Sequence, residues 1–240
     1  MPRDTPGLIP GLSLTQSVYE QLRGDLLACR LWPGDRLKIS DLCQSMGVNL
    51  GAVREALSRL SSEGLVVAEP QRGFRVAPIS ATELRDLTEV RIDVETRCLR
   101  RSIEGAGVEW ETAIVAAHHG MTRLPERDPE DPLRANDAWS VHHAAFHRAL
   151  VAGCGSPWLL RLRDSLYDQS ERYRRLSVPL ARTERDVAGE HREIMEAAVS
   201  RQADRACALL AAHFRATTLI LLEVDALGAD RRPEKAVAAG

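Results

Sequence analysis

Paired cysteines and long apolar runs are both missing from this sequence of 240 residues. Its five cysteines are odd in number and scattered, and none are spaced as Cys-x-x-Cys, which argues against a disulfide framework and a zinc knuckle. No uninterrupted apolar run approaches the roughly 20 residues that span a bilayer. The proline-broken start also lacks the apolar segment of a signal peptide. We therefore expect a cytoplasmic protein with reduced thiols and no membrane partner.

An excess of one charge is missing as well. The chain has 32 Lys and Arg residues against 34 Asp and Glu, a net charge of −2 at pH 7. A chain of this kind does not coat nucleic acid through bulk charge, and its near-neutral head disfavours a structural DNA-bending protein. A small DNA-reading module, whose basic residues need only be local, is not excluded. The 44% apolar and 28% charged content is typical of globular proteins of one large or two ordinary domains.

The apolar periodicity divides the chain into a small mixed head and an all-helical body. Residues 1–13 are expected to be a flexible leader and residues 228–240 a disordered tail. The head, residues 14–79, has the pattern of three helices, with Ser40 capping the second and Asn49 the third, and then a hairpin. The body, residues 80–227, has the pattern of helices over about 80–104, 108–122, 134–152, 156–176, 180–200 and 202–226. The first of these carries an apolar stripe of Leu84, Leu87, Val90, Val94 and Cys98.

The head has the element order of a winged helix-turn-helix domain. The fold class is therefore mainly α, with this domain followed by a bundle of six to seven helices. The third helix would present its N-terminal half to the DNA major groove and pack its other face on the core. Side chains outside its packing stripe include Asn49, Arg54, Ser58 and Arg59, and the hairpin tip carries Arg72 and Arg75. From spacing alone, an ordinary amphipathic helix with solvated charges is an equal alternative.

Residues 22–80 strongly resemble the winged-helix domain of GntR-type transcriptional regulators. The landmarks are Pro33-Gly34, Gly47-Val48, the Val-Arg-Glu-Ala-Leu run at 53–57, Glu63-Gly64-Leu65 and Arg72-Gly73. The family usually has Ser-Arg-Thr-Pro where this chain has Asn-Leu-Gly-Ala at 49–52. Leu50 thus replaces an arginine that the resemblance places on DNA, and Arg54 is the clearest retained contact. The resemblance implies an altered operator, on which Leu50 is either a lost contact or a contact to a thymine methyl.

Four histidines fall on the core-facing stripes of three predicted helices. His143 and His147 lie four residues apart on one helix, and His191 and His213 lie on two others. A buried imidazole must satisfy two ring nitrogens, so several together favour a common partner such as a metal ion. Taken singly, each is more simply interpreted as a hydrogen-bonded core histidine. Taken as a set, they indicate a site.

The body resembles the FCD ligand-sensing domain of the FadR subgroup over residues 86–102, 142–159 and 190–214. In many members one Asp and three His bind a divalent metal, and a small carboxylate effector completes the coordination. The resemblance implies metal ligands at His143, His147, His191 and His213, and effector contacts at Arg91 and Ser156. Here His143 stands in the aspartate's position and Ser156 where asparagine is common. An all-imidazole set prefers zinc, with nickel or copper as alternatives, and favours an anionic effector. The other alternative is that the metal has been lost.

These inferences predict a ligand-responsive regulator, repressor or activator, that is a homodimer on a pseudo-palindromic DNA operator and not an enzyme. A small organic acid in the body would change the spacing of the two heads. The alternative is a metal-dependent hydrolase with an accessory nucleic-acid-binding head, since histidine ligands and water can activate a nucleophile. Against it, HExxH is missing, and Glu190, about 100° around its helix from His191, is interpreted as a solvated charge.

Overall fold

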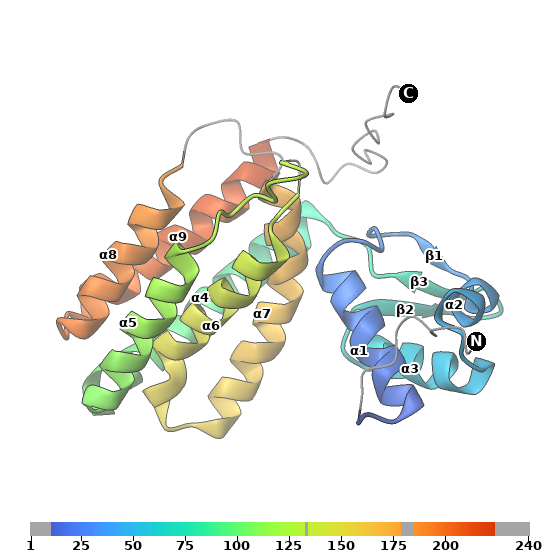
Figure 1. The fold of residues 1–240 in the computed structure, drawn as a ribbon. Helices are drawn as coiled ribbons and strands as arrows, with labels where there is room; N and C mark the ends of the chain where they lie inside the picture. The colour runs from blue at the N-terminus through green and yellow to red at the C-terminus, as the bar shows by residue number, and fades with distance from the viewer. Residues whose placement is uncertain (1–10, 133, 179–184, 224–240) are drawn as a thin grey trace. The chain divides into compact units, whose positions relative to one another are not determined.

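The computed structural model describes residues 11–132, 134–178 and 185–223. The chain divides into two compact units, of which the first holds residues up to Ser80 and the second begins at Ala81. The predicted tail at 228–240 and most of the predicted leader at 1–13 lie outside the described residues, as do the expected start of a helix at 180 and the end of another at 226. Both units are mainly helical, so the predicted fold class is confirmed (Figure 1).

The first unit is a winged helix-turn-helix domain. Its elements are α1 (Leu14–Leu27), β1 (Arg36–Leu37), α2 (Ile39–Met46), α3 (Leu50–Ser62), β2 (Val66–Glu69) and β3 (Gly73–Val76). The strands form an antiparallel sheet in the order β1-β3-β2, with Val66 opposite Val76 and Leu37 opposite Phe74. The hairpin was predicted. The strand β1, only two residues long, was not, because so short a segment has no periodicity.

Side-chain caps mark the starts of α1 and α3 in this unit, but not that of α2. The Asn49 side chain accepts a hydrogen bond from the Ala52 amide at 2.9 Å, as predicted, so α3 begins at Leu50. Gly47, at φ +66°, takes the left-handed conformation that ends α2. The predicted cap at Ser40 is wrong. The helix already begins at Ile39, and the Ser40 hydroxyl donates to the Asp41 carboxylate at 3.0 Å.

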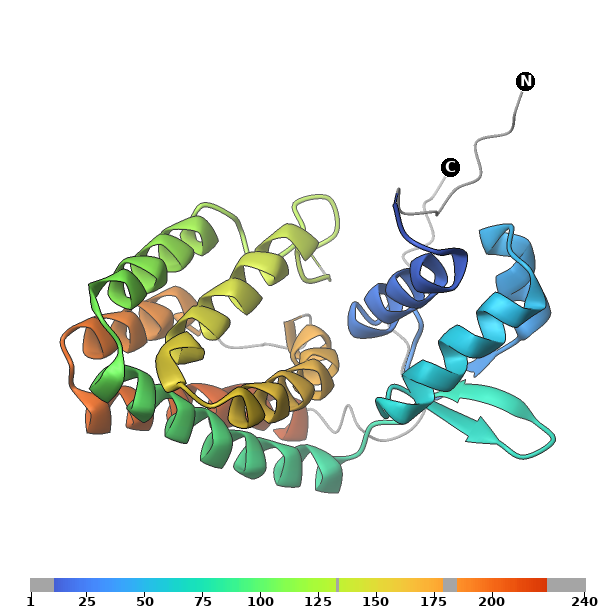
Figure 2. The ribbon, with the colours of Figure 1, turned by 90° about the horizontal axis from the view of Figure 1, so that it is seen from below.

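The second unit contains six α-helices in the part of the chain that the structure describes (Figure 2). They are α4 (Ala81–Gly105), α5 (Val108–Thr122), α6 (Asp137–Val151), α7 (Pro157–Ser177), α8 (Val187–Val199) and α9 (Ala203–Glu223), with the short 3-10 helix η1 (Ala152–Cys154) after α6. Helix α4 packs against α9 and α7, and α5 packs against α6 and α8. By length and composition alone α9 is long and apolar enough to span a membrane, but it packs on α4 and α8 and buries His213.

The apolar stripe predicted on α4 is wrong in part. Leu84 and Cys98 are buried, but Val90 is 40% exposed. The buried face instead includes Arg91 and Glu95, whose side chains form an ion pair at 2.5 Å. A pattern of apolar residues misses such a face, because two charged residues can be buried when they compensate each other. This face of α4 is turned toward the histidines described next.

Candidate metal centre and nucleic-acid interface

Three helices of the second unit bring four histidines together. His143 and His147 lie one turn apart on α6, His191 is near the start of α8, and His213 is near the middle of α9. All four side chains are buried, and one nitrogen from each lies within 4.8 Å of the others. The ring centroids of His191 and His213 are 4.5 Å apart, as are those of His143 and His147. The four histidines singled out in the sequence therefore form one cluster.

Side-chain caps set where α6 and α8, which carry three of these histidines, begin. The Asn136 side chain accepts hydrogen bonds from the first amides of α6. Asp186 does the same for α8, accepting from the Gly189 amide at 2.7 Å. A Cβ on Gly189 would lie 2.2 Å from the Asp186 carboxylate, so a larger residue there would require the Asp186 side chain to shift. His191 follows two residues later with its ring in the cluster.

Two of the histidines leave all their nitrogens unpaired. Both ring nitrogens of His147 and of His191 are buried and have no hydrogen-bond partner among the described residues. Leaving a buried polar atom unsatisfied costs about 1–3 kcal/mol. A metal ion bound by one nitrogen of each ring would remove part of this cost, and four buried nitrogens converging within 4.8 Å suit a four-ligand site. The donor set therefore fits a divalent transition metal.

The other two histidines are each held through Nδ1. His143 Nδ1 hydrogen-bonds the Tyr167 hydroxyl at 3.2 Å, and His213 Nδ1 hydrogen-bonds the Glu190 carboxylate at 2.7 Å. Each bond orients its ring and leaves Nε2 for a ligand, as outer partners do in metal sites. The interpretation of Glu190 as a solvated charge is wrong. The angle between Glu190 and His191 around α8 does not indicate that α9 packs close enough for His213 to contact Glu190.

The electrostatics of the cluster keep the rings neutral. Burial, reinforced by repulsion between neighbouring histidines and arginines, lowers the pKa of His143, His147 and His191 well below 6.5. Burial also lowers the pKa of His213, although Glu190 acts in the opposite direction. Burial tends to raise the pKa of Glu190, but hydrogen bonds with His213 and Arg185 lower it to about 2. At neutral pH the cluster thus presents neutral imidazoles, the form that binds metals.

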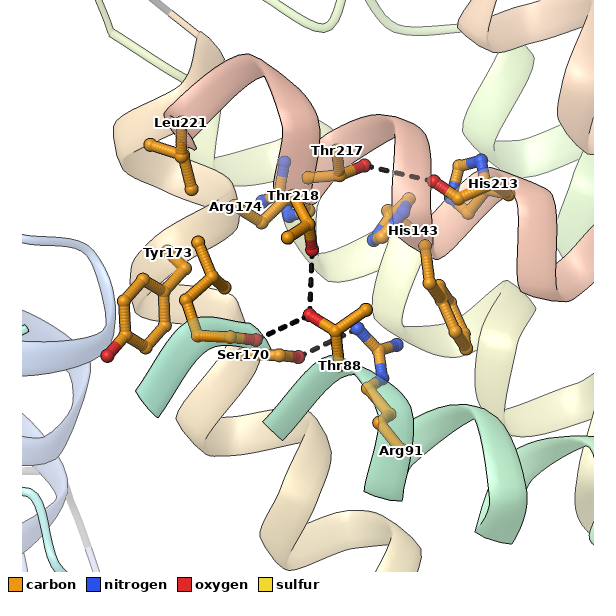
Figure 3. Close-up of a pocket in the computed structure, with 12 residues that line it drawn as sticks. Thr88, Arg91, His143, Ser170, Tyr173, Arg174, His213, Thr217, Thr218 and Leu221 are labelled. Carbon is orange, nitrogen blue, oxygen red and sulfur yellow. Dashed lines mark hydrogen bonds between the residues drawn. The ribbon is translucent and has the colours of Figure 1, made fainter. Parts of the chain in front are cut away.

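A cavity of about 440 Å³, part of it open to solvent, adjoins the cluster (Figure 3). His143 and His213 form part of its wall, and α4, α7 and α9 supply the rest. The hydroxyls of Thr88 and Thr218 hydrogen-bond each other at 2.7 Å between α4 and α9. The further lining residues are Leu84, Arg91, Ser170, Tyr173, Arg174, Phe214, Thr217 and Leu221. The lining therefore combines hydroxyl groups with two arginines.

Both cavity arginines are paired with buried glutamates. Arg91 pairs with Glu95 and donates to the Ser170 hydroxyl at 2.8 Å. Arg174 pairs with Glu171 at 2.7 Å, but its Nη1 is buried and has no hydrogen-bond partner among the described residues. Arg174 therefore keeps an unused donor beside the cavity. The sequence does not single out Arg174, because α7 carries several arginines and their spacing does not indicate which one lines the cavity.

Ser156, the second predicted effector contact, lies elsewhere. Its hydroxyl caps α7 by accepting from the Leu159 amide at 3.4 Å. It is not among the described residues that line the cavity, whereas Arg91 is. The structure thus brings Arg91 together with the histidines and leaves Ser156 at a helix start.

The predicted DNA contacts of the first unit fall into two groups. Leu50, Arg54 and Ser58 follow one exposed face of α3, and Arg72 is exposed in the turn of the hairpin. The remaining three have roles within the domain. Asn49 caps α3, the Arg59 guanidinium lies 3.7 Å from the centre of the Tyr19 ring, and Arg75 pairs with Glu69 at 3.0 Å.

Two family models match this chain. The model described as "Bacterial regulatory proteins, gntR family" matches residues 14–76, and the FCD domain model matches residues 86–216. Among known relatives, the HTH-type transcriptional regulator BphR of Paraburkholderia xenovorans is 38% identical over 90% of this chain and 88% of that protein. The HTH-type transcriptional repressor GlaR of Escherichia coli is 34% identical over 81% of this chain and 90% of that protein.

Solved structures share the fold of the chain. E. coli McbR/YncC has a TM-score of 0.71 at 19% identity, covering 89% of this chain and 99% of that one. A putative GntR regulator from Rhodococcus sp. RHA1 also has a TM-score of 0.71, at 22% identity, covering 92% of this chain and 100% of that one. At these identities the likeness concerns the arrangement of the helices and strands.

Proposed function

Because this chain belongs to the GntR family of DNA-binding transcriptional regulators and carries an FCD domain, we propose that it senses a small organic acid through a metal ion held in its helical unit. The alternative of a metal-dependent hydrolase does not stand, since the relatives are transcriptional regulators and not enzymes. The observation that carries the proposal is the convergence of four buried histidine nitrogens within 4.8 Å.

The metal would be held by His143, His147, His191 and His213. Four imidazole ligands without a carboxylate suit zinc first, and nickel or copper as alternatives, rather than calcium or magnesium. The bound ion would supply a positive charge that attracts an anionic ligand into the adjoining cavity. Tyr167 and Glu190 would act on it only through the histidines that they orient.

The effector is expected to carry a carboxylate. Each cavity arginine shares its glutamate with a second arginine, Arg91 with Arg163 on Glu95 and Arg174 with Arg175 on Glu171. A bound ion would add further positive charge to this environment, which favours an anionic ligand. The free Nη1 of Arg174 adds a hydrogen-bond donor for an oxygen-rich ligand, whereas the hydroxyls of Thr88 and Ser170 donate to the carbonyl oxygens of Leu84 and Tyr167. The cavity lies between α4, α7 and α9 beside His143 and His213, so a small organic acid in it would lie next to the ion.

The response to the effector would pass through α4. This helix lines the cavity with Leu84, Thr88 and Arg91, and its first residue, Ala81, directly follows the DNA-binding unit along the chain. In a homodimer of the FadR subgroup, two such units would read a pseudo-palindromic operator. An effector shifts the spacing of these units only if it binds one arrangement more tightly than the other.

The test is the metal content of the protein. Elemental analysis of the chain, purified and then dialysed against equimolar zinc, should give about one ion per chain, and His147→Ala and His213→Ala should lose it. His142→Ala is the matched control, because His142 lies beside His143 on α6 but is exposed. A wild-type chain that retains no zinc, nickel or copper under these conditions would show that the cluster does not hold a metal.

A further inference from the structure

The recognition helix of this protein begins with an exposed leucine. Leu50 is the first residue of α3, and its side chain is 50% exposed. Among the described residues of α1, α2 and α3, it is the one large hydrophobic residue that is exposed in this way. A single exposed leucine is common on protein surfaces. What distinguishes Leu50 is its neighbours on the helix.

Leu50 belongs to the face of α3 that is available to DNA. Arg54 and Ser58, four and eight residues further on, are exposed on the same side of the helix. The opposite side, with Val53, Ala56 and Leu60, is fully buried in the core of the domain. When the N-terminal half of such a helix enters the major groove, its exposed face meets the edges of the bases.

The residues that flank Leu50 leave its side chain unobstructed. Gly51 is exposed and has no side chain, and the Asn49 side chain is turned back onto the Ala52 amide at 2.9 Å. The cap occupies only Oδ1 of Asn49, whose Nδ2 stays a donor just before the helix. Within the first turn of α3 itself, residues 50–53, Gly51 has no side chain and Ala52 and Val53 are buried, so Leu50 is the side chain that this turn offers to the groove.

We infer that Leu50 recognises the C5-methyl group of a thymine in the operator. In the major groove thymine alone among the four bases presents a methyl group, whereas an apolar side chain placed against the donors and acceptors of other bases would leave them unsatisfied. Arg54 is suited to a guanine, and one helical turn, about 5.4 Å, separates it from Leu50. The thymine should therefore lie within about two base pairs of that guanine, since successive bases are about 3.4 Å apart. The inference rests on the DNA-binding function and on α3 being the helix that enters the groove.

The test uses the full chain and DNA that lacks single methyl groups. Duplexes that the protein retains from a random library are sequenced. In the duplex that binds most tightly, each dT is replaced in turn by dU, which leaves base pairing unchanged. Fluorescence anisotropy then gives the dissociation constants. In each half-site, replacing one particular dT, which lies within about two base pairs of a dG, should lower the affinity roughly fourfold. This change corresponds to the burial of one methyl-sized group. Leu50→Ala should bind the dT and dU duplexes equally.

The control is Leu12→Ala, which removes an exposed leucine of the same unit outside α3 and should keep the preference for dT. The inference is overturned if the wild type tolerates dU at every position, or if Leu50→Ala still discriminates between dT and dU. In either case, if the library is still enriched in specific sequences, the DNA-binding function remains supported although the role of Leu50 does not. A library from which no sequence is enriched would contradict that function itself, and the role of Leu50 with it.

Discussion

The carboxylate of Glu190 lies 2.7 Å from Nδ1 of His213, so the histidine cluster has an acidic group beside its four rings. Arg185 binds the same carboxylate at 2.6 Å and also donates to the His213 carbonyl oxygen at 2.9 Å. This arrangement fixes the ring of His213 and places a negative charge on the side of the ring opposite the proposed ion. Glu190 therefore partly replaces the charge that an aspartate ligand would have supplied.

Glu190→Gln should weaken metal binding roughly 10- to 100-fold, because an amide neither compensates the charge of the ion nor increases the basicity of His213 as a carboxylate does. Competition with a chromophoric zinc chelator measures this change. Glu193→Gln, an exposed position on the same helix, is the control and should bind zinc as the wild type does. Equal affinity of both variants would mean that Glu190 does not support the site.

The metal-free protein should lose stability as the pH falls below 6.5. The pKa values of His143, His147 and His191 are lower in the folded chain than the ordinary 6.5. The unfolded chain therefore takes up protons first, and each such histidine lowers the free energy of unfolding by up to about 1.4 kcal/mol per pH unit below 6.5. Urea unfolding at pH 7.5, 6.5 and 5.5 measures this. Unfolding free energies that stay constant over this range would contradict the burial of neutral rings.

A second loss of stability is expected in more acidic solution. The pKa of Glu190 is lowered from 4.5 to about 2, so its ionised form contributes stability above pH 4.5 that disappears as the pH falls toward 2. In Glu190→Gln this lower step should be reduced, while the step that begins at pH 6.5 remains. The two steps can be separated by extending the urea series below pH 4.5, to about pH 2.5.

Arg174→Lys should reduce the response to the effector without removing the metal. Lysine keeps a positive charge beside Glu171 but lacks the forked guanidinium that reaches both its partner and the cavity. The rise in melting temperature given by an organic acid with zinc present should become smaller, because it follows the affinity for the folded chain. Arg175→Lys, which also pairs with Glu171 but does not line the cavity, is the control. An undiminished shift in Arg174→Lys would exclude this residue from the effector site.

Arg54→Ala and Arg72→Ala should weaken DNA binding in different ways. Loss of a base contact at Arg54 should cost about 1–3 kcal/mol and relax the preference at one position of each half-site. Loss of a phosphate contact at Arg72 should weaken all duplexes alike and reduce the salt dependence of binding. Anisotropy titrations on matched and mismatched duplexes at two salt concentrations distinguish the two. If Arg54→Ala weakened every duplex equally, its assignment to base recognition would fail.

Much of the fold could be predicted from local patterns. The helix expected over 108–122 has those bounds in the structure, and Asn49 caps α3 as its place before an apolar stripe predicts. The four histidines could be grouped because they lie at core-facing positions of their helices. These signals are local, depending on residues within a few turns of one another.

The contacts made by Glu190, Tyr167 and Arg174 could not be predicted in this way. Each lies on a helix with several similar residues, and which one meets a histidine or the cavity depends on how α7 and α8 pack against α6 and α9. The exposure of Val90 and the burial of Glu95 on α4 likewise depend on how the helices pack. A charged residue is buried where a partner from another turn or another helix compensates it.

The amino-acid sequence by itself determined the order of the elements, the helical face of each histidine and the resemblance to its family, because periodicity, capping residues and motifs act over short distances along the chain. Only the tertiary structure decided that four imidazoles share one space, that Glu190 and Tyr167 orient two of them, and that Ser156 stays outside the cavity. Those relationships join residues from different helices, and the packing of whole helices sets their distances.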